Sequence, residues 1–445
     1  MPSFAALVER HASAGLARRL APIAEIVDEI ATGTEGRAIA RRMALIAFAV
    51  RIVSAAIAYL SQVLMARWIG DFEYGVFVVV WVGVVVLGGL AIVRFVPQYQ
   101  ETGEADLLRG VLLASRVQGA VSSTLVALVG VAGVWLFQES ISSYYLLPLY
   151  LAAICLPMMA LSEIENGLAH GFSWANLALW PTFIWRPTFI LVFMGGAILL
   201  GAPATAITAM LAAVAATWFV TVAQIVAIEM RVRRTVPHGE RSYRPAEWIA
   251  ATWPVFVAES FYGLLTNVDI LIVGQLMPPN DAAVYFAAAK TLALVHLVYF
   301  AVRAGTMPRF SQYFTARDWV RLEGILRDGL LWTFWPSLLM VGAVLVFGRC
   351  LLGMFGPGFE EGYPLLFILC FGILARAAIG PAESALTMAG QQRHCAMIYF
   401  GCFFLNVVLN YSLIPFYGLT GAAIATTVTL TTEAVAVYFV TRRRL

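Results

Sequence analysis

Long apolar segments follow one another from about residue 43 to residue 441, and short turns of glycine, proline, asparagine and aspartate separate them. Each segment is long enough to cross a hydrocarbon core of about 30 Å as an α-helix. The pattern predicts an all-α polytopic membrane protein. Its twelve transmembrane helices are predicted at about 43–68, 74–97, 108–137, 145–169, 174–200, 204–230, 249–276, 282–308, 325–349, 363–388, 395–416 and 419–441.

One stretch of the chain occurs twice. The matching pairs, all separated by 211 residues (285−74, 308−97, 327−116), are Tyr74 and Tyr285, Pro97 and Pro308, and Arg116 and Arg327. A constant offset indicates a duplicated unit, and six crossings per unit give both copies the same orientation, as in a parallel repeat. We predict two six-helix lobes, an N-lobe at 43–230 and a C-lobe at 249–445, joined by a polar linker at 231–248.

Residues 1–42 precede the first apolar segment and hold six arginines, which makes a cleaved signal peptide unexpected. Leu16, Leu20 and Ile23 recur at helical spacing, with charged residues on the other faces. This pattern predicts an amphipathic helix on the cytosolic membrane surface. A partly disordered tail is the alternative.

The arginines predict the orientation of the helices. One side of the membrane receives the N-terminal arginines, Arg109, the cluster between Arg231 and Arg244, and the last arginines of the chain. The other side has little beyond Arg67 and Arg349. Because positive charge favours the cytosolic side, both termini are predicted to be cytosolic.

Composition supports a membrane protein and argues against an enzyme. The 445 residues are 61% hydrophobic and 12% charged, whereas soluble proteins are about 25% charged. The sequence contains neither H-E-x-x-H, nor a P-loop, nor G-x-G-x-x-G, nor G-x-S-x-G. Its five cysteines lack the C-x-x-C spacing of redox or metal sites. We expect no catalysis, no metal and no nucleic-acid partner.

Ionisable residues inside the apolar segments are the candidates for function, because a charge in hydrocarbon costs at least about 2.5–3.5 kcal/mol. The predicted cationic, substrate-binding set is Arg51, Arg116, Arg186, Lys290, Arg303 and Arg376. The predicted set for ion coupling, or for pairing these cations, is Glu163, Glu259 and Asp269. Structural ion pairing alone is the alternative for each residue, since buried charges are normally compensated.

Two polar stripes predict a cavity between the lobes. Arg51, Ser54, Ala58 and Gln62 share one face of the first segment; Glu259, Tyr262, Thr266 and Asp269 share one face of the seventh. Arginine binds phosphate through paired hydrogen bonds, so an anionic, phosphate-bearing cargo is predicted. Lys290 and Arg303 lie on nearly opposite faces of the eighth helix and cannot both face one cavity unless that helix is distorted.

Several short patterns resemble a known family. They are A-R-W-I-G-D-F-E-Y-G-V-F at 66–77, V-R-F-V-P-Q-Y at 93–99, N-V-D at 267–269 and G-L-T-G-A-A at 418–423. Together they resemble the polysaccharide transporters, the O-antigen and exopolysaccharide flippases of the multidrug/oligosaccharidyl-lipid/polysaccharide exporter superfamily. The similarity covers about residues 40–441.

The resemblance implies a two-lobed flippase that moves polyprenyl-pyrophosphate-linked oligosaccharides across the bacterial inner membrane by alternating access. It implies a coupling ion, H⁺ or Na⁺, but no other cofactor. Expected partners are the lipid bilayer and the glycan polymerase and glycosyltransferases of the same pathway. The alternatives are a cation-coupled multidrug exporter, disfavoured because Arg51 stands where such exporters often carry an acid, and a membrane scaffold for glycan assembly.

Overall fold

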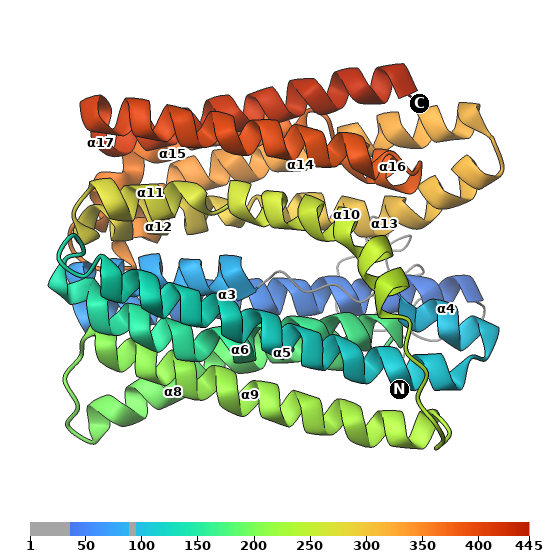
Figure 1. Ribbon diagram of the computed structural model, residues 1–445. Coiled ribbons are helices and arrows are strands. Elements are labelled where there is room, and N and C mark those ends of the chain that lie inside the picture. Colours follow the sequence, from blue (N-terminus) through green and yellow to red (C-terminus); the bar gives the residue numbers. More distant parts are fainter. Residues whose placement is uncertain (1–35, 89–94, 445) are drawn as a thin grey trace, which may run out of the picture. The chain divides into compact units, whose positions relative to one another are not determined.

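The computed structural model describes residues 36–88 and 95–444, so most of the predicted amphipathic segment lies outside the described residues. The described chain is almost wholly helical (Figure 1). In chain order its helices are α3 (Gly36–Gly88), α4 (Phe95–Thr102), α5 (Ala105–Leu136), α6 (Ser143–Gly171), α7 (Ala175–Trp180), the π-helical turn η1 (Pro181–Trp185), α8 (Arg186–Leu199), α9 (Ala206–Thr235), α10 (Pro245–Leu265), α11 (Val268–Leu276), α12 (Pro279–Ala293), α13 (His296–Thr315), α14 (Trp319–Gly353), the 3₁₀ turn η2 (Phe359–Gly362), α15 (Tyr363–Ala377), α16 (Ala382–Met388) and α17 (Gln392–Arg444).

The predicted all-α membrane fold is confirmed. Within the described residues, eight helices are long and apolar enough to cross a membrane, or nine if the bent pair of 359–377 and 382–388 is one span. Two of the eight, 52–88 and 392–443, are far longer than the roughly 20 residues that one crossing needs. Each contains a glycine with non-helical backbone, Gly70 in α3 and Gly418 in α17.

The α3 helix folds back on itself at Gly70. In a straight helix, the α-carbons of Gln62 and Tyr74 would lie about 18 Å apart, at 1.5 Å per residue. Instead, Tyr74 Oη donates a hydrogen bond to Gln62 Oε1 at 2.9 Å. The reversal needs glycine, since φ at Gly70 is 78°, in the left-handed region.

The α17 helix reverses at Gly418 in the same way. Asn406 Nδ2 donates to Thr429 Oγ1 at 3.3 Å, although 23 residues separate them, a distance of about 34 Å along a straight helix. At Gly418, φ is 56°. Both long helices are therefore hairpins, and the predicted segment boundaries near Gly70 and Gly418 are correct.

The helices of each half of the sequence pack mainly on their neighbours in that half. In the first half, α6 packs against α5 and α9, and α8 packs against α9; in the second, α17 packs against α10, α11 and α15 (Figure 1). The largest apolar core includes both repeat tyrosines, Tyr74 and Tyr285, which are fully buried. The two copies of the repeat thus contribute matching residues to one core.

The eighth predicted segment is divided into two helices. Helix α12 ends at Ala293 and α13 begins at His296. Lys290 therefore belongs to a different helix from Tyr299 and Arg303.

The linker between the halves is tied to the start of α5. Arg109 donates from Nε to Glu240 O and from Nη1 to Pro237 O, both at 2.7 Å. Trp248 Nε1 donates to Tyr99 Oη at 2.8 Å.

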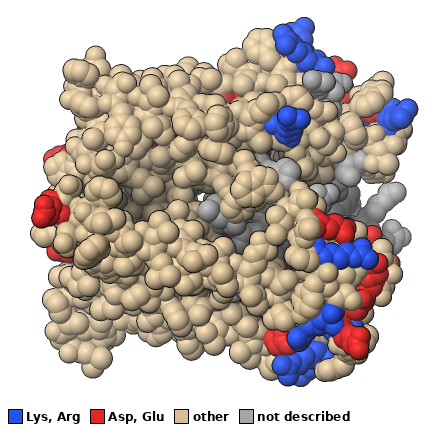
Figure 2. Space-filling model, viewed as in Figure 1, with Lys and Arg blue, Asp and Glu red and all other residues tan. Residues whose placement is uncertain are grey.

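On the face shown in Figure 2, Lys and Arg side chains gather at the right-hand end, the end at which Figure 1 shows α4.

Candidate functional site

A cavity of about 540 Å³ is lined by residues from both halves of the chain. The first half supplies both arms of α3, the middle of α6, η1 and the start of α8; the second half supplies α10, the turn after it and α12. This volume lies within the range of about 300–1,000 Å³ that ligand sites occupy. The cavity is the candidate functional site.

Four of the nine residues predicted to form the site line this cavity: Glu163, Arg186, Glu259 and Lys290. Each half provides one cation and one acid. Glu163 and Arg186 come from α6 and α8, and Glu259 and Lys290 come from α10 and α12. The structure thus brings together charges that lie up to 127 residues apart in sequence (290−163).

Arg186 is 5% exposed and is held by weak partners. Its Nη2 donates to Ser162 Oγ and its Nη1 contacts Met159 Sδ at 3.0 Å. Its Nε has no hydrogen-bond partner among the described residues. Since thioether sulfur is a weak acceptor, the guanidinium keeps much of its hydrogen-bonding capacity.

The backbone before Arg186 explains its position. Pro181 opens a π-helical turn in which Arg186 N donates to Pro181 O, five residues back. Such wide turns arise where a proline disturbs the regular ladder and are frequent at functional sites. The turn places Thr182 and Phe183 on the cavity wall together with Arg186 and Pro187.

Glu163 is held at the cavity by a chain of amides. Asn166 Nδ2 donates to Glu163 Oε2 at 3.2 Å and to Thr182 Oγ1 at 2.8 Å. Gln224 Nε2, from α9, donates to Asn166 Oδ1 at 2.8 Å. Neutral hydrogen-bond donors therefore hold the Glu163 carboxylate in place.

On α12, Lys290 Nζ lies 4.9 Å from the centre of the Phe286 ring, a cation–π contact. Among the described residues, neither Lys290 nor Arg186 takes part in an ion pair. Glu259 lines the cavity with an exposed side chain. The cavity therefore holds two cations whose charge is not neutralised by direct pairing.

Arg376 belongs to a separate buried cluster behind the cavity wall. Its Nη2 lies 3.3 Å from Glu383 Oε2 and 3.5 Å from Glu433 Oε1. It also donates to Tyr262 Oη at 3.4 Å, and Tyr262 lines the cavity. Tyr299 from α13 faces the same guanidinium, with its ring centre at 5.8 Å. Arg376 thus contacts the cavity wall through Tyr262 and is compensated by two carboxylates.

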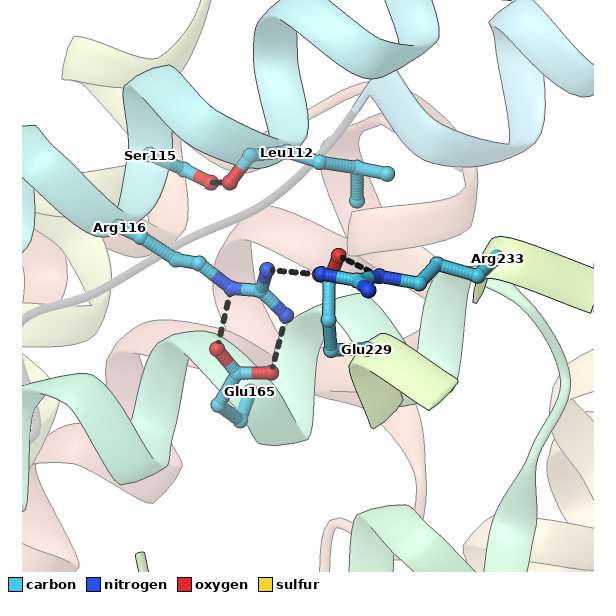
Figure 3. A network of polar contacts seen from close by, with 6 residues as sticks. All are labelled: Leu112, Ser115, Arg116, Glu165, Glu229 and Arg233. Carbon is cyan, nitrogen blue, oxygen red and sulfur yellow. Dashed lines mark hydrogen bonds and ion pairs between the residues drawn. The ribbon is translucent and has the colours of Figure 1, made fainter. Parts of the chain in front are cut away.

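Arg116 lies in an ion-pair network that joins α5, α6 and α9 (Figure 3). Its Nε and Nη2 donate to the two oxygens of Glu165 at 2.6 and 2.9 Å. Its Nη1 donates to Glu229 Oε2 at 2.9 Å, and Glu229 also accepts from Arg233 Nε at 3.0 Å. All these donors are used, and Arg116 is not among the residues that line the cavity.

The remaining predicted residues lie outside the cavity lining or outside the described side chains. Asp269 is buried and accepts hydrogen bonds from Tyr285, Thr426 and the Ile270 backbone. Arg303 is half-buried on α13. The side chain of Arg51 is outside the described residues. Of the two predicted polar stripes, Ala58, Gln62, Glu259 and Tyr262 line the cavity.

Sequence reasoning missed the aromatic and small polar part of the lining. Phe77 and Trp81, on the second arm of α3, stack with ring centres 6.1 Å apart. Phe183 and Asn267 complete this set. Their segments are apolar on every face, so no periodicity distinguished a cavity face from a packing face.

Comparison with known proteins gives the fold and its relatives. Residues 254–412 match the MatE family model. The chain is 26% identical over 176 residues, 38% of this chain and 36% of the relative, to the Haloferax volcanii protein named "Probable low-salt glycan biosynthesis flippase Agl15". It is 24% identical, over 38% of this chain and 41% of the relative, to a Shigella flexneri protein named as an O-antigen transporter. The chain thus matches less than half the length of these curated relatives.

Two solved structures share the fold over most of both chains. An inward-facing multidrug resistance MATE family transporter of the MOP superfamily superposes with a TM-score of 0.73 at 16% identity, covering 88% of this chain and 94% of that one. The lipid II flippase MurJ in an inward closed conformation superposes with a TM-score of 0.69 at 14% identity, covering 89% and 87%. Residues 254–412 therefore match the MatE model, the chain has the all-helical fold of the MATE and MurJ structures, and the resemblance that the sequence predicted is confirmed.

Proposed function

We propose that this protein is a flippase that moves a polyprenyl-pyrophosphate-linked oligosaccharide from the inner to the outer leaflet of the bacterial inner membrane. One observation carries the proposal: Arg186 and Lys290, from different halves of the chain, line one cavity with no ion pair among the described residues. Cations without a direct ion pair are costly at membrane depth. A negatively charged cargo would offset the free-energy cost of burying these cations.

A diphosphate fits the chemistry of these two side chains. A guanidinium donates paired hydrogen bonds to phosphate oxygens, and an ammonium binds phosphate as a compact charge. The free Nε of Arg186 leaves a donor for such a ligand. Because the two cations come from different halves of the chain, a diphosphate bound by both would also link the two halves of the transporter.

The rest of the lining suits a sugar beside the diphosphate. Trp81, Phe77 and Tyr262 offer aromatic faces, and Gln62 and Asn267 offer amide groups. Aromatic side chains combine an apolar face with, in Tyr and Trp, a polar handle. The flippase names of the relatives from Haloferax volcanii and the O-antigen transporter name from Shigella flexneri agree with a glycan-bearing cargo.

The architecture that goes with this function has twelve crossings in two lobes, with both termini cytosolic. The eight candidate spans become ten when α3 and α17 are each counted as a hairpin (8 + 2). The bent pair of α15 and α16 makes eleven, and α10 followed by α11 makes twelve. The arginine-rich end in Figure 2 would then face the cytosol.

Ion coupling is assigned to the acids. Glu163 and Glu259 line the cavity, and Asp269 is buried with neutral donors around it. Any of these three could bind H⁺ or Na⁺ during the cycle. Arg116 and Arg376 are assigned to structural ion pairs rather than to cargo binding, since each is bound to two carboxylates.

A second candidate is a cation-coupled exporter of amphipathic cations. Glu163 and Glu259 favour it, because two acids on a partly aromatic wall could bind a cationic drug. The MATE structure with the same fold is named as a multidrug resistance transporter. The two candidates make opposite predictions for the cations and the acids of the cavity.

Binding measurements on the purified protein test the proposal. An undecaprenyl-diphosphate sugar should bind more tightly than a cationic dye, and R186Q or K290Q should each weaken that binding about 10- to 100-fold, since a hydrogen bond to a charged group is worth about 1.5–3 kcal/mol. R233Q, which removes an exposed arginine of the Arg116 network, is the control and should bind normally. If the dye binds more tightly and E163Q or E259Q abolishes its binding, the protein is the exporter instead.

A further inference from the structure

One end of the cavity is closed by contacts between the two halves of the chain. Met65 and Phe77, on the two arms of α3, line the cavity at this end. Beyond them the arms continue to the turn at Gly70, through Arg67 on one side and Tyr74 on the other. We call the contacts of residues 59–79 with the second half the seal.

Arg67 joins α3 to the end of α14. Its Nε donates to Met354 O and its Nη2 donates to Gly353 O at 3.3 Å. The last carbonyls of a helix have no partner within the helix and carry partial negative charge, so a guanidinium is well suited to bind them. This contact also explains a basic residue on the side of the membrane that the arginine distribution otherwise leaves poor in positive charge.

Two further polar contacts cross the seal. Asn280 Nδ2, at the start of α12, donates to Asp71 Oδ2 at 2.7 Å. Tyr59 Oη donates to Leu351 O at 3.1 Å, one turn before the carbonyls that Arg67 binds. The polar contacts therefore join both ends of the α3 turn to two separate helices of the second half.

Below the polar contacts, the seal is apolar and tightly packed. Gly75 lies against Pro279, where a β-carbon would collide with the Pro279 carbonyl, and Gly274 lies against Val79. The ring of Tyr74 lies 6.1 Å from the rings of both Phe286 and Phe359. Close backbone approach and edge-to-face aromatic rings fill this end of the cavity.

We propose that the seal is the gate on the extracytoplasmic side of the transporter, and that Arg67, Asp71 and Asn280 form its latch. Hydrogen bonds to exposed groups exchange for bonds to water with little net change in free energy, so such a latch can open and close. Opening would separate α3 from α12 and α14 and give the cavity a path to the outer leaflet. The gate rests on alternating access and on the proposed orientation, but not on the identity of the cargo.

Thiol labelling tests the gate. Ser61 lines the cavity and is small and buried, so S61C places a reporter thiol there. C350A removes the one exposed cysteine of the five, and C350A alone measures background labelling. In oriented membrane vesicles, a membrane-impermeant thiol reagent is applied to each face in turn. Labelling of S61C from the Arg67 face should be slow.

R67Q and N280A, each added to S61C/C350A, should raise labelling from the Arg67 face at least 5-fold by opening the latch. R349Q removes the other arginine of that side, which stacks on Tyr363 of its own half, and should leave the rate unchanged. N280A removes no charge, so it tests the latch even if R67Q folds poorly. Unchanged labelling in both variants at unchanged Tm, or an increase only from the opposite face, would overturn the proposal. Since no glycolipid is used, unchanged diphosphate binding in R186Q would count against the proposed cargo and not against the gate.

Discussion

Tyr285 donates a hydrogen bond to Asp269 Oδ2 at 2.7 Å, whereas its counterpart in the first copy of the repeat, Tyr74, donates to Gln62 Oε1 at 2.9 Å. Each tyrosine ties a helix to the helix that precedes it in the chain. The two copies share the contact and differ in the acceptor, a carboxylate in one and a neutral amide in the other. The difference gives only the second copy an acid at this position, and Asp269 is one of the three acids proposed for ion coupling.

Removing the two hydroxyls should therefore have unequal effects. A hydrogen bond to a charged group contributes about 1.5–3 kcal/mol, against about 0.5–1.5 kcal/mol for a neutral pair. Y285F should lower the free energy of unfolding by about 2 kcal/mol and Y74F by about 1 kcal/mol. Thermal unfolding in detergent measures both, and equal losses would indicate that Asp269 carries a proton in the resting protein.

The Arg116 network should be a strong determinant of stability. Glu165 is fully buried and binds both arms of the Arg116 guanidinium. R116Q leaves that carboxylate without its cation and should cost about 3–5 kcal/mol. R116Q/E165Q, which removes both charges, should recover much of the loss. R233Q, on the exposed edge of the network, should cost no more than about 1 kcal/mol. If R116Q and R233Q cost the same, the network does not hold the three helices together.

Sequence alone predicted the fold class and the turns at Gly70 and Gly418. These depend on length, on glycine backbone freedom and on local periodicity, which short stretches of sequence record. The repeat predicted that Tyr74 and Tyr285 occupy like positions, and both are fully buried in one core. The criterion of length and apolarity nevertheless finds eight or nine spans rather than twelve, partly because it counts each hairpin once.

The division of the buried charges could not be predicted. Arg116 and Arg186 both lie in long apolar segments, yet one binds Glu165 and Glu229 and the other lines the cavity. The partners of Arg116 are 49 and 113 residues away, so its pairing depends on the rotation of three helices about their axes. No local pattern encodes that rotation in a helix that is apolar on all faces.

Two glycines of the α3 hairpin should differ in their tolerance of alanine. Gly70 has open space around it, so G70A is strained only by the backbone, at φ 78° and ψ 170°, a region that is almost confined to glycine and costs about 1–3 kcal/mol. Gly75 has ordinary helical backbone but lies against the Pro279 carbonyl, so G75A must push α12 away from α3. We expect G70A to fold with a modestly lower Tm, and G75A to fold poorly or to raise S61C labelling from the Arg67 face. A G75A variant with normal Tm and normal labelling would contradict the close packing of the seal.

Arg186 should lower the thermal stability of the folded protein. A buried guanidinium without an ion pair costs at least about 2.5–3.5 kcal/mol at membrane depth, and methionine fills a similar volume without charge. R186M should therefore leave Tm unchanged or raise it, while binding of the undecaprenyl-diphosphate sugar falls at least 10-fold.

R376M is the matched comparison, because Arg376 is equally buried but lies between Glu383 and Glu433. Its removal leaves Glu433, which is 1% exposed, without a cation, and should cost about 3–5 kcal/mol. If Tm rises in R186M and falls in R376M, Arg186 serves cargo binding and Arg376 serves the stability of the fold. A fall of Tm in R186M as large as that in R376M would assign Arg186 to the structure and remove the main support for an anionic cargo.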